Sequence, residues 1–317
     1  MMAQGKGNIV RYEQIDESAA GQRIDNYFFR IAKGVPKSRI YRILRGGEVR
    51  VNGRRVPQTY RLAVGDEVRI PPLRLAESSA PMPAPVGKPL PVVFEDEFFI
   101  VLNKPAGHAV HGGSGISFGV IEQLRAQRPE LKMLELVHRL DRETSGLLIV
   151  AKKRSALTAL QNMMREGRIE KRYFTLVAGQ WPSPQQHVHM PLLKYLTETG
   201  ERRVKVSEAG KPAHSIVRLL KRWQQFSLLE VELKTGRTHQ IRVHLSHLGF
   251  PLVGDDKYGN FPLNRMLVND GLRRMFLHAA KLAFTHPMKG EAFVFDAPLP
   301  AELQGFVTRL DGWRSEK

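Results

Sequence analysis

The stretch HRLDRETSGLLIVAKK, residues 138–153, joins a charged loop to a fully apolar run. The run GLLIVA is short and shows no polar alternation, which is typical of a strand buried on both faces. Asp141 stands just before this run, between Arg139 and Arg142. A carboxylate in such a loop is either a structural ion-pair partner or a catalytic acid that faces an anionic ligand. The rest of the chain has to distinguish these two interpretations.

The chain is long and strongly basic. It has 317 residues, enough for about two domains. Lys and Arg number 49 against 31 Asp and Glu, which gives a formal net charge of +18. An excess of this size is typical of proteins that bind a polyanion, and its spread over several segments favours an RNA or DNA surface over a membrane-binding helix. A generally basic protein without such a partner is the simpler alternative.

Several classes of protein are disfavoured. The chain has no cysteine, which excludes a disulfide framework and a thiol nucleophile. No apolar run approaches the roughly 18 residues of a membrane span, and no signal-peptide core is seen at the start, so we expect a soluble, cytoplasmic protein without membrane contact. No nucleotide-binding or dinucleotide-binding glycine motif is found, so no cofactor is expected. His244 and His247 lack further ligands at metal-binding spacing, and we predict no metal site.

A proline-rich stretch divides the chain. The sequence LRLAESSAPMPAPVGKPL, residues 73–90, has four prolines among small residues. Such a composition is typical of a stiff linker. We therefore predict a small domain over residues 1–75, a linker over 76–90 and a larger domain over 91–317.

The small domain combines a cationic helix with a tight turn. The segment SRIYRILR, residues 38–45, predicts a short helix with apolar residues on one face and cationic residues on the other, and Gly46 and Gly47 end it. Asn52-Gly53 predicts a hairpin turn between the strands EVRV and RRVP. Residues 1–75 hold 15 Lys and Arg against 7 Asp and Glu. A solvated charged face is the alternative, but we predict that this surface contacts the phosphate backbone of RNA or DNA. The predicted RNA-binding residues are Lys37, Ser38, Arg39, Arg42, Arg45, Arg50, Arg54 and Arg55.

The large domain mixes helices with many hairpins. Few strand–helix–strand units occur, which favours an α+β fold with a largely antiparallel sheet. Ser155 is the expected N-cap of one helix. Helices are predicted over residues 118–128, 155–167, 238–249 and 301–310. Strands are predicted within 91–105 (two strands), 146–153, 171–181, 213–223, 226–235, 281–286 and 291–298.

Two further segments complete the candidate site. EKRYFTLV sets Tyr173 in a strand, and GRTHQIRVHLSHLGFPLVGDDKYG places Arg242 on a helix beside the apolar position Ile241. A buried arginine needs a carboxylate partner. We hypothesise that Arg242 pairs with Asp141, which would keep this carboxylate ionised at neutral pH and able to act as a nucleophile or base.

These motifs resemble those of a known family. HRLDRETSGLLIVAKK is similar to the signature of the RluA-type pseudouridine synthases, KRYFTLV to their tyrosine motif and TGRTHQIRVH to a third motif. GVPKSRIYRILRGGEVRVNG, residues 34–53, resembles an S4 RNA-binding module. The resemblance spans about residues 20–298. It predicts a small S4-like RNA-binding domain followed by a mainly antiparallel, mixed-sheet pseudouridine synthase domain.

The resemblance implies a role for each motif. Asp141 would be the catalytic aspartate that converts uridine to pseudouridine, with the C1′–N1 bond broken, the C1′–C5 bond formed and no cofactor. Arg139 would fill the gap left by a target nucleotide flipped out of its stack. Tyr173 would stack on the flipped uracil. The remaining active-site support would come from Arg242, Ile241 and Val243.

The resemblance also implies the partner. The expected substrate is 23S rRNA, free or in an assembling large subunit, with no protein partner and a monomeric enzyme. One alternative is a non-catalytic RNA-binding or ribosome-assembly factor, and another is a synthase that acts on a different RNA. The intact set of Asp141, Tyr173 and Arg242 favours an active enzyme. Direct attack by Asp141 on the sugar and base abstraction through a glycal both stay open.

Overall fold

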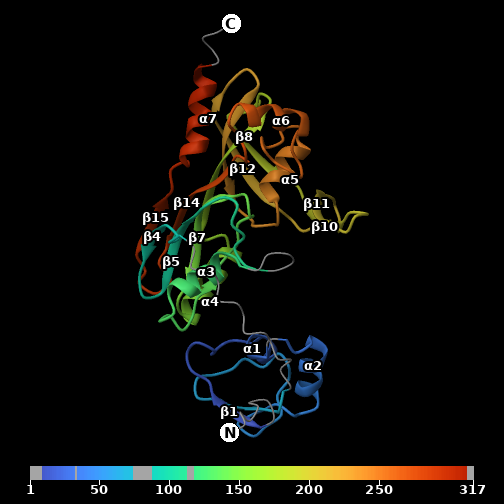
Figure 1. The fold of residues 1–317 in the computed structure, drawn as a ribbon, viewed down its shortest axis with the longest axis vertical. Coiled ribbons are helices and arrows are strands. Elements are labelled where there is room, and N and C mark those ends of the chain that lie inside the picture. Colours follow the sequence, from blue (N-terminus) through green and yellow to red (C-terminus); the bar gives the residue numbers. More distant parts are fainter. Residues whose placement is uncertain (1–8, 33, 74–87, 113–117, 313–317) are drawn as a thin grey trace, which may run out of the picture.

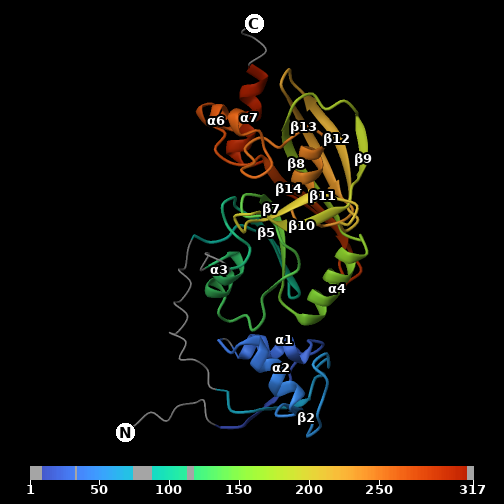
Figure 2. The same cartoon turned by 90° about the vertical axis from the view of Figure 1, so that its right-hand side faces the viewer.

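The computed structural model describes residues 9–32, 34–73, 88–112 and 118–312 (Figure 1). Most of the predicted linker lies outside these residues, so the boundaries at 75 and 91 stay a prediction. Helices α1 and α2 lie at one end of the molecule, and α7 lies at the other (Figures 1 and 2). The predicted α+β class is confirmed.

The N-terminal unit packs two helices on a small antiparallel sheet of order β1-β3-β2. The predicted turn is present, with φ of 51° at Asn52 and 74° at Gly53, but the predicted strand RRVP after it is wrong. Pro57 has no N–H to donate to a ladder, and β2 pairs instead with β3, whose Val68 and Ile70 are buried. The elements are β1 Arg11–Gln14, α1 Ile24–Ile31, α2 Lys37–Arg45, β2 Arg50–Val51 and β3 Glu67–Ile70.

The C-terminal unit is built on a ten-stranded sheet of order β4-β5-β7-β14-β8-β13-β12-β9, with β15 beside β14 and β6 beside β7. Among the described strands, only β7 and β14 pair in parallel, so the predicted mixed, mainly antiparallel sheet is confirmed. A separate hairpin joins β10 to β11. The strands are β4 Val92–Glu95, β5 Phe99–Lys104, β6 Glu135–Leu136, β7 Ser145–Ala151, β8 Glu170–Ala178, β9 Gln185–His189, β10 Leu192–Leu196, β11 Arg202–Val206, β12 His214–Arg222, β13 Phe226–Leu233, β14 Leu277–Thr285 and β15 Ala292–Asp296.

The four helices predicted in this unit are confirmed, with small shifts at their ends. Ser155 is not an N-cap, because α4 starts at Arg154 and its N-cap is Lys153. The helix α6 is an addition; the Asn260 side chain caps it by accepting from Leu263 N, and Pro262 lies in its first turn. The helices are α3 Val120–Gln127, α4 Arg154–Arg165, α5 Gln240–His247, α6 Phe261–Asn269 and α7 Ala301–Gly312.

Strand β7 is buried along its whole length, which explains its unbroken apolar run. Leu148 and Val150 pack into the cluster that also contains residues of α3 and α5, whereas Leu147 and Ile149 pack into the cluster that contains residues of α4. At its start Gly146 has φ of +109°, and a Cβ there would lie 2.2 Å from the carbonyl oxygen of Ala279. Only glycine fits this approach of β7 to β14, which fixes the chain next to Asp141.

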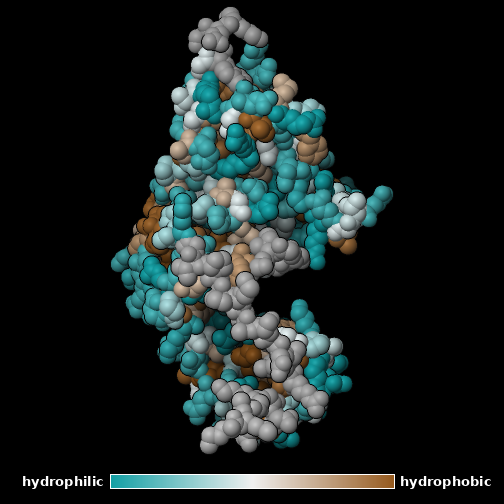
Figure 3. Space-filling model, in the orientation of Figure 1, coloured by the Kyte–Doolittle hydropathy of each residue, from teal (hydrophilic) through white to brown (hydrophobic). Residues whose placement is uncertain are grey.

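The surface is mainly hydrophilic in the view of Figure 3. An apolar patch lies where β4 and β15 run, and Val92, Val93 and Val294 are exposed there. Within the described residues, no helix combines the length and apolar character that crossing a membrane requires.

Candidate active site

A cavity of about 450 Å³ lies between the loop before β7, the strand β8 and the loop that leads from β13 into α5. Its apolar lining comes from Leu140, Tyr173, Leu233, Ile241 and Leu277. Its cationic lining comes from Arg139, Arg165, Lys171, Lys234, Arg237 and Arg242. Asp141 is the one carboxylate residue that lines it in the described part of the chain. The apolar lining can therefore contact a flat, uncharged ring, and the cationic lining can contact an anionic backbone attached to it. Asp141 places one carboxylate beside such a ring.

Arg242 reaches Asp141, as the sequence predicted. Its Nη1 lies 3.3 Å from Oδ2 of Asp141, and the arginine side chain is 5% exposed against 20% for the aspartate. His239, at the N-terminus of α5, places Nε2 3.8 Å from the other oxygen of Asp141. The carboxylate thus lies half-buried at the mouth of a cationic cavity. A cation at this distance favours the ionised form of the carboxyl group, and the partial exposure leaves that group open to a substrate.

The main partner of Arg242 is Asp255, which the sequence analysis did not identify. Asp255 is fully buried and accepts from Nε and Nη2 of Arg242 at 2.7 Å each. The same carboxylate accepts from the backbone N–H groups of Lys257 and Tyr258. Burial raises the pKa of Asp255, but the hydrogen bonds and charge of Arg242 outweigh it and hold the pKa below its usual value. The two-point contact fixes the guanidinium plane and leaves Nη1 for Asp141.

Buried polar groups hold the loop that carries Asp141. Asp141 and Thr144 form a turn, with a backbone hydrogen bond of 3.1 Å. Arg274 donates to the carbonyl oxygen of Glu143 at 3.0 Å and to Oγ of Ser145 at 2.8 Å. His278 contacts the same Ser145 hydroxyl at 2.9 Å. These contacts hold the residues after Asp141 in one fixed turn.

Lys104, at the end of β5, supports the loop from below. It is completely buried, and its Nζ donates to the carbonyl oxygens of Pro105, His108 and Arg142 at 2.8, 2.8 and 3.1 Å. Burial lowers the pKa of Lys104 to about 7, while the charges of Glu143 and Asp141 act in the opposite direction. The only sequence signal for this residue was a lysine at the end of an apolar strand.

Tyr173 and Arg139 both line the cavity but differ in exposure. Tyr173 is 7% exposed, and burial, followed by the charge of Asp141, raises the pKa of its phenol. Its hydroxyl therefore stays protonated at neutral pH. Arg139 is exposed and forms no ion pair with any described residue, so its guanidinium is available to a ligand.

The predicted apolar wall is only half present. Ile241 lines the cavity, but Val243 does not. Val243 packs against Leu192, Val204 and Ala213, under the β10–β11 hairpin. Helical geometry explains this difference. Successive residues of a helix are rotated by about 100°, so the side chain of Val243 points about 200° away from that of Ile241.

Two histidines beside the cavity are held in fixed positions. His138 accepts from the backbone N–H of Ile149 at 3.1 Å, and burial, together with Lys171, lowers its pKa to about 4. His138 therefore acts as a structural hydrogen-bond acceptor for β7. His239 contacts the Tyr258 hydroxyl through Nδ1 at 2.9 Å, and burial lowers its pKa although Asp141 opposes the shift. Both imidazoles are neutral at neutral pH.

The predicted RNA-binding residues of the N-terminal unit gather on α2 and the following turn. Arg39 is half-buried and lies 3.6 Å from Glu48, and the other seven residues are exposed. The Arg55 guanidinium donates to the carbonyl oxygen of Arg45, which joins the turn to the end of α2. These eight residues thus lie close together and form one cationic surface.

Comparison with known families gives two matches. Residues 98–247 match the model described as RNA pseudouridylate synthase, and residues 22–68 match the model described as S4 domain. The first match contains Asp141, Tyr173 and Arg242, and the second contains α1, α2 and all eight residues of the cationic surface.

Similar proteins are found along nearly the whole chain. The chain is 50% identical over 307 residues to the ribosomal large subunit pseudouridine synthase C of Yersinia pestis, covering 95% of this chain and 96% of that protein. It is 50% identical over 308 residues to the Escherichia coli (strain K12) protein of the same name, covering 95% and 97%. Among solved structures, human RNA pseudouridylate synthase domain containing 1 superposes with a TM-score of 0.57 at 26% identity, covering 72% of this chain and 97% of that one.

Proposed function

The chain belongs to the RNA pseudouridine synthase family, and we propose that its substrates are uridines of 23S rRNA. It is an isomerase that carries an S4 domain. The reaction breaks the C1′–N1 bond, joins C1′ to C5 and moves the C5 proton away while N1 gains one. The observation that carries the proposal is Asp141, the one carboxylate that lines the cavity among the described residues, held by a buried arginine in a cationic pocket.

Asp141 is the catalytic residue in this proposal. Its carboxylate contacts Nη1 of Arg242, and this contact holds it at the cavity. A carboxylate there can attack C1′ or remove a proton from the sugar, and the geometry supports both routes. Arg242 stabilises the anion in either case, and Asp255 acts as a positioning residue that orients Arg242.

Tyr173 holds the base in this proposal. Its buried ring lies among Leu140, Leu233 and Ile241, which offer a flat apolar surface to a flipped uracil. Its phenol keeps the proton at neutral pH, so it can donate a hydrogen bond but cannot serve as a phenolate base. Arg139, exposed at the cavity mouth, is the candidate for the gap in the RNA stack.

The remaining cations bind the RNA backbone. The cavity lining contributes Arg165, Lys234 and Arg237, and the S4 domain contributes the surface on α2 and its turn. Phosphate contacts of this kind position the nucleic acid and make its affinity salt-dependent. Because the substrate is ribosomal RNA, we expect the protein to act in the cytoplasm, and the predicted monomer stays a prediction.

Pseudouridine mapping tests the substrate. All rRNA and tRNA would be mapped in cells that carry either the wild-type protein or Asp141→Ala. The proposal expects specific 23S rRNA positions to lose modification only with the variant. Loss at tRNA or 16S rRNA positions alone would show a different substrate, and no change at any position would favour an RNA-binding factor.

A further inference from the structure

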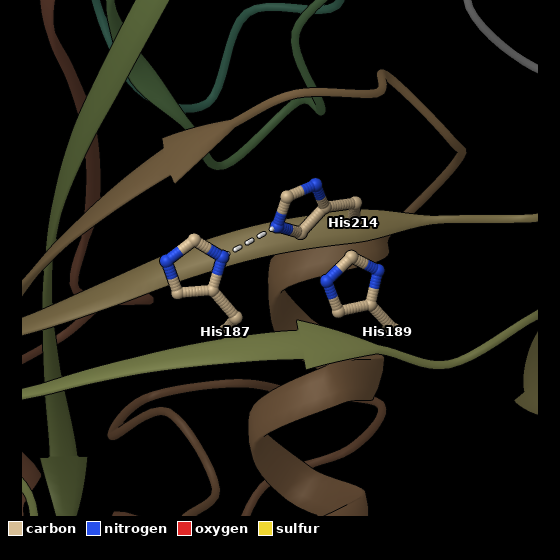
Figure 4. A group of neighbouring side chains, drawn as sticks. All are labelled: His187, His189 and His214. Carbon is tan, nitrogen blue, oxygen red and sulfur yellow. Dashed lines mark hydrogen bonds between the residues drawn. The ribbon is translucent and has the colours of Figure 1, made fainter.

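Three histidines meet on the outer face of the sheet, away from the lining of the active-site cavity (Figure 4). His187 and His189 are alternate residues of the edge strand β9, so both side chains point to the same face while Val188 between them is buried. His214, on the neighbouring strand β12, stands directly opposite His189 in the sheet register. The sheet geometry therefore gathers the three imidazoles without help from a loop.

The ring positions suit a small ion. One potential ligand atom from each histidine lies within 4.8 Å of the other two. Nδ1 of His187 lies 3.1 Å from Nε2 of His214, and the rings of His189 and His214 are stacked at 3.8 Å. In a tetrahedral site with metal–nitrogen bonds of about 2.0–2.1 Å, two ligand nitrogens stand roughly 3.3–3.4 Å apart. Small side-chain rotations thus convert the pair into two ligands.

We propose that His187, His189 and His214 bind a Zn²⁺ ion or a similar divalent transition metal, with water completing the coordination. Imidazole nitrogen suits Zn²⁺, Ni²⁺ and Cu²⁺ and does not suit Mg²⁺ or Ca²⁺, which prefer oxygen. The proton in the His187–His214 hydrogen bond moves to the other nitrogen of its own ring when both lone pairs turn to the ion. Nothing in the sequence indicated this group, because β9 was not predicted and only the spacing of His244 and His247 resembled that of metal ligands.

The ion would fix the sheet edge next to the active site. His214 donates its backbone N–H to Thr235 Oγ1 at 2.9 Å, and its carbonyl oxygen accepts from Lys234 N at 3.1 Å and Gln240 Nε2 at 3.0 Å. All three partners line the active-site cavity. A metal ion that links β9 to β12 would therefore fix the position of His214, to which these three cavity residues are hydrogen-bonded.

Metal titration of the full-length protein, with any affinity tag removed, tests the proposal. Wild-type protein and the variant His187→Ala/His189→Ala are titrated with Zn²⁺ alone by calorimetry, and thermal unfolding is followed with and without one equivalent of Zn²⁺. His247→Ala is the matched control, since His247 is also an exposed histidine but lies outside the group.

We expect one Zn²⁺ per chain in the wild-type protein and in His247→Ala, with a rise in the unfolding midpoint. The double variant should bind at least tenfold more weakly and show no such rise. Millimolar Mg²⁺ should not displace the Zn²⁺. Equal Zn²⁺ affinity in the double variant, or no binding by the wild-type protein, overturns the site. If the double variant instead loses RNA affinity while the wild-type protein takes up no Zn²⁺, the histidines contact RNA and the metal proposal fails.

Discussion

Replacing Asp255 by asparagine removes the fork that orients Arg242. Both carboxylate oxygens of Asp255 face N–H groups of Arg242 at 2.7 Å, so the amide nitrogen of an asparagine would meet a donor instead of an acceptor. Arg242 is 5% exposed and would keep a buried charge with a broken contact. Removing one partner of a buried ion pair costs about 3–5 kcal/mol. We expect Asp255→Asn to lower the free energy of unfolding by that amount.

The same variant should lose activity, because Arg242 no longer presents Nη1 to Asp141. A displacement of about 1 Å in an active site reduces the rate about 100-fold. Asp256→Asn is the matched control: Asp256 contacts the same Nη2 at 3.1 Å but is 63% exposed, so its loss should cost at most about 1 kcal/mol.

Urea unfolding followed by tryptophan fluorescence measures the effect. All three tryptophans lie after residue 180, so their signal reports on the synthase domain. The pKa of Asp255 is lowered, so its contribution is present above the unfolded pKa of about 3.9 and is lost as the pH falls below that value. The gap between wild type and Asp255→Asn should thus be full at pH 7 and shrink below about pH 4. If Asp255→Asn has the same free energy of unfolding as Asp256→Asn and keeps full turnover, the orientation of Arg242 does not depend on Asp255.

Three other perturbations test separate parts of the structure. Lys104→Met removes the donor to three backbone carbonyl oxygens and should reduce both turnover and stability. Because the pKa of Lys104 is lowered to about 7, the folded wild-type protein binds fewer protons than the unfolded chain between about pH 7 and 10. In pH-dependent unfolding, the stability of the wild-type protein should therefore rise over this range relative to that of the variant. A variant with the same pH slope as wild type would contradict this burial effect. Tyr173→Phe keeps the ring and should keep substrate affinity, whereas Tyr173→Leu should weaken binding in a fluorescence titration by about 1–3 kcal/mol; equal affinities would exclude stacking. Replacing Arg39, Arg42 and Arg45 by glutamine should weaken RNA binding and reduce the salt slope by about 2–3, and an unchanged slope would remove α2 from the interface.

The sequence predicted the elements whose pattern is local. The apolar run of β7, the amphipathic helix α2 and the β12–β13 hairpin follow from periodicity and turn residues, and the structure confirms them. The strands β9, β10 and β11 were not predicted. The residues of β9 and β11 are mostly polar, and the apolar residues of β10 do not alternate with polar ones. Edge strands and surface hairpins show little of the hydrophobic pattern on which such predictions depend.

Contacts in the candidate site could be predicted where the residue types within a motif imply a partner. The pairing of Arg242 with Asp141 followed from a helix face and a need for charge compensation, and the structure shows it. The role of Asp255 did not follow, because two adjacent aspartates in a loop give no indication of which one is buried. Lys104 was missed for a similar reason, since its three acceptors are backbone carbonyl oxygens that no side-chain pattern reveals.

Single-turnover kinetics of Asp141→Asn tests directly whether Asp141 is the catalytic group. Purified wild-type and variant proteins would be mixed in excess with an RNA that carries a mapped target uridine, and pseudouridine formation and RNA affinity would be measured together. Asparagine has nearly the same shape, so the fold and the RNA affinity should stay within about threefold of wild type. We expect no pseudouridine from the variant. Turnover by Asp141→Asn at a rate near that of wild type would show that Asp141 is not the catalytic group.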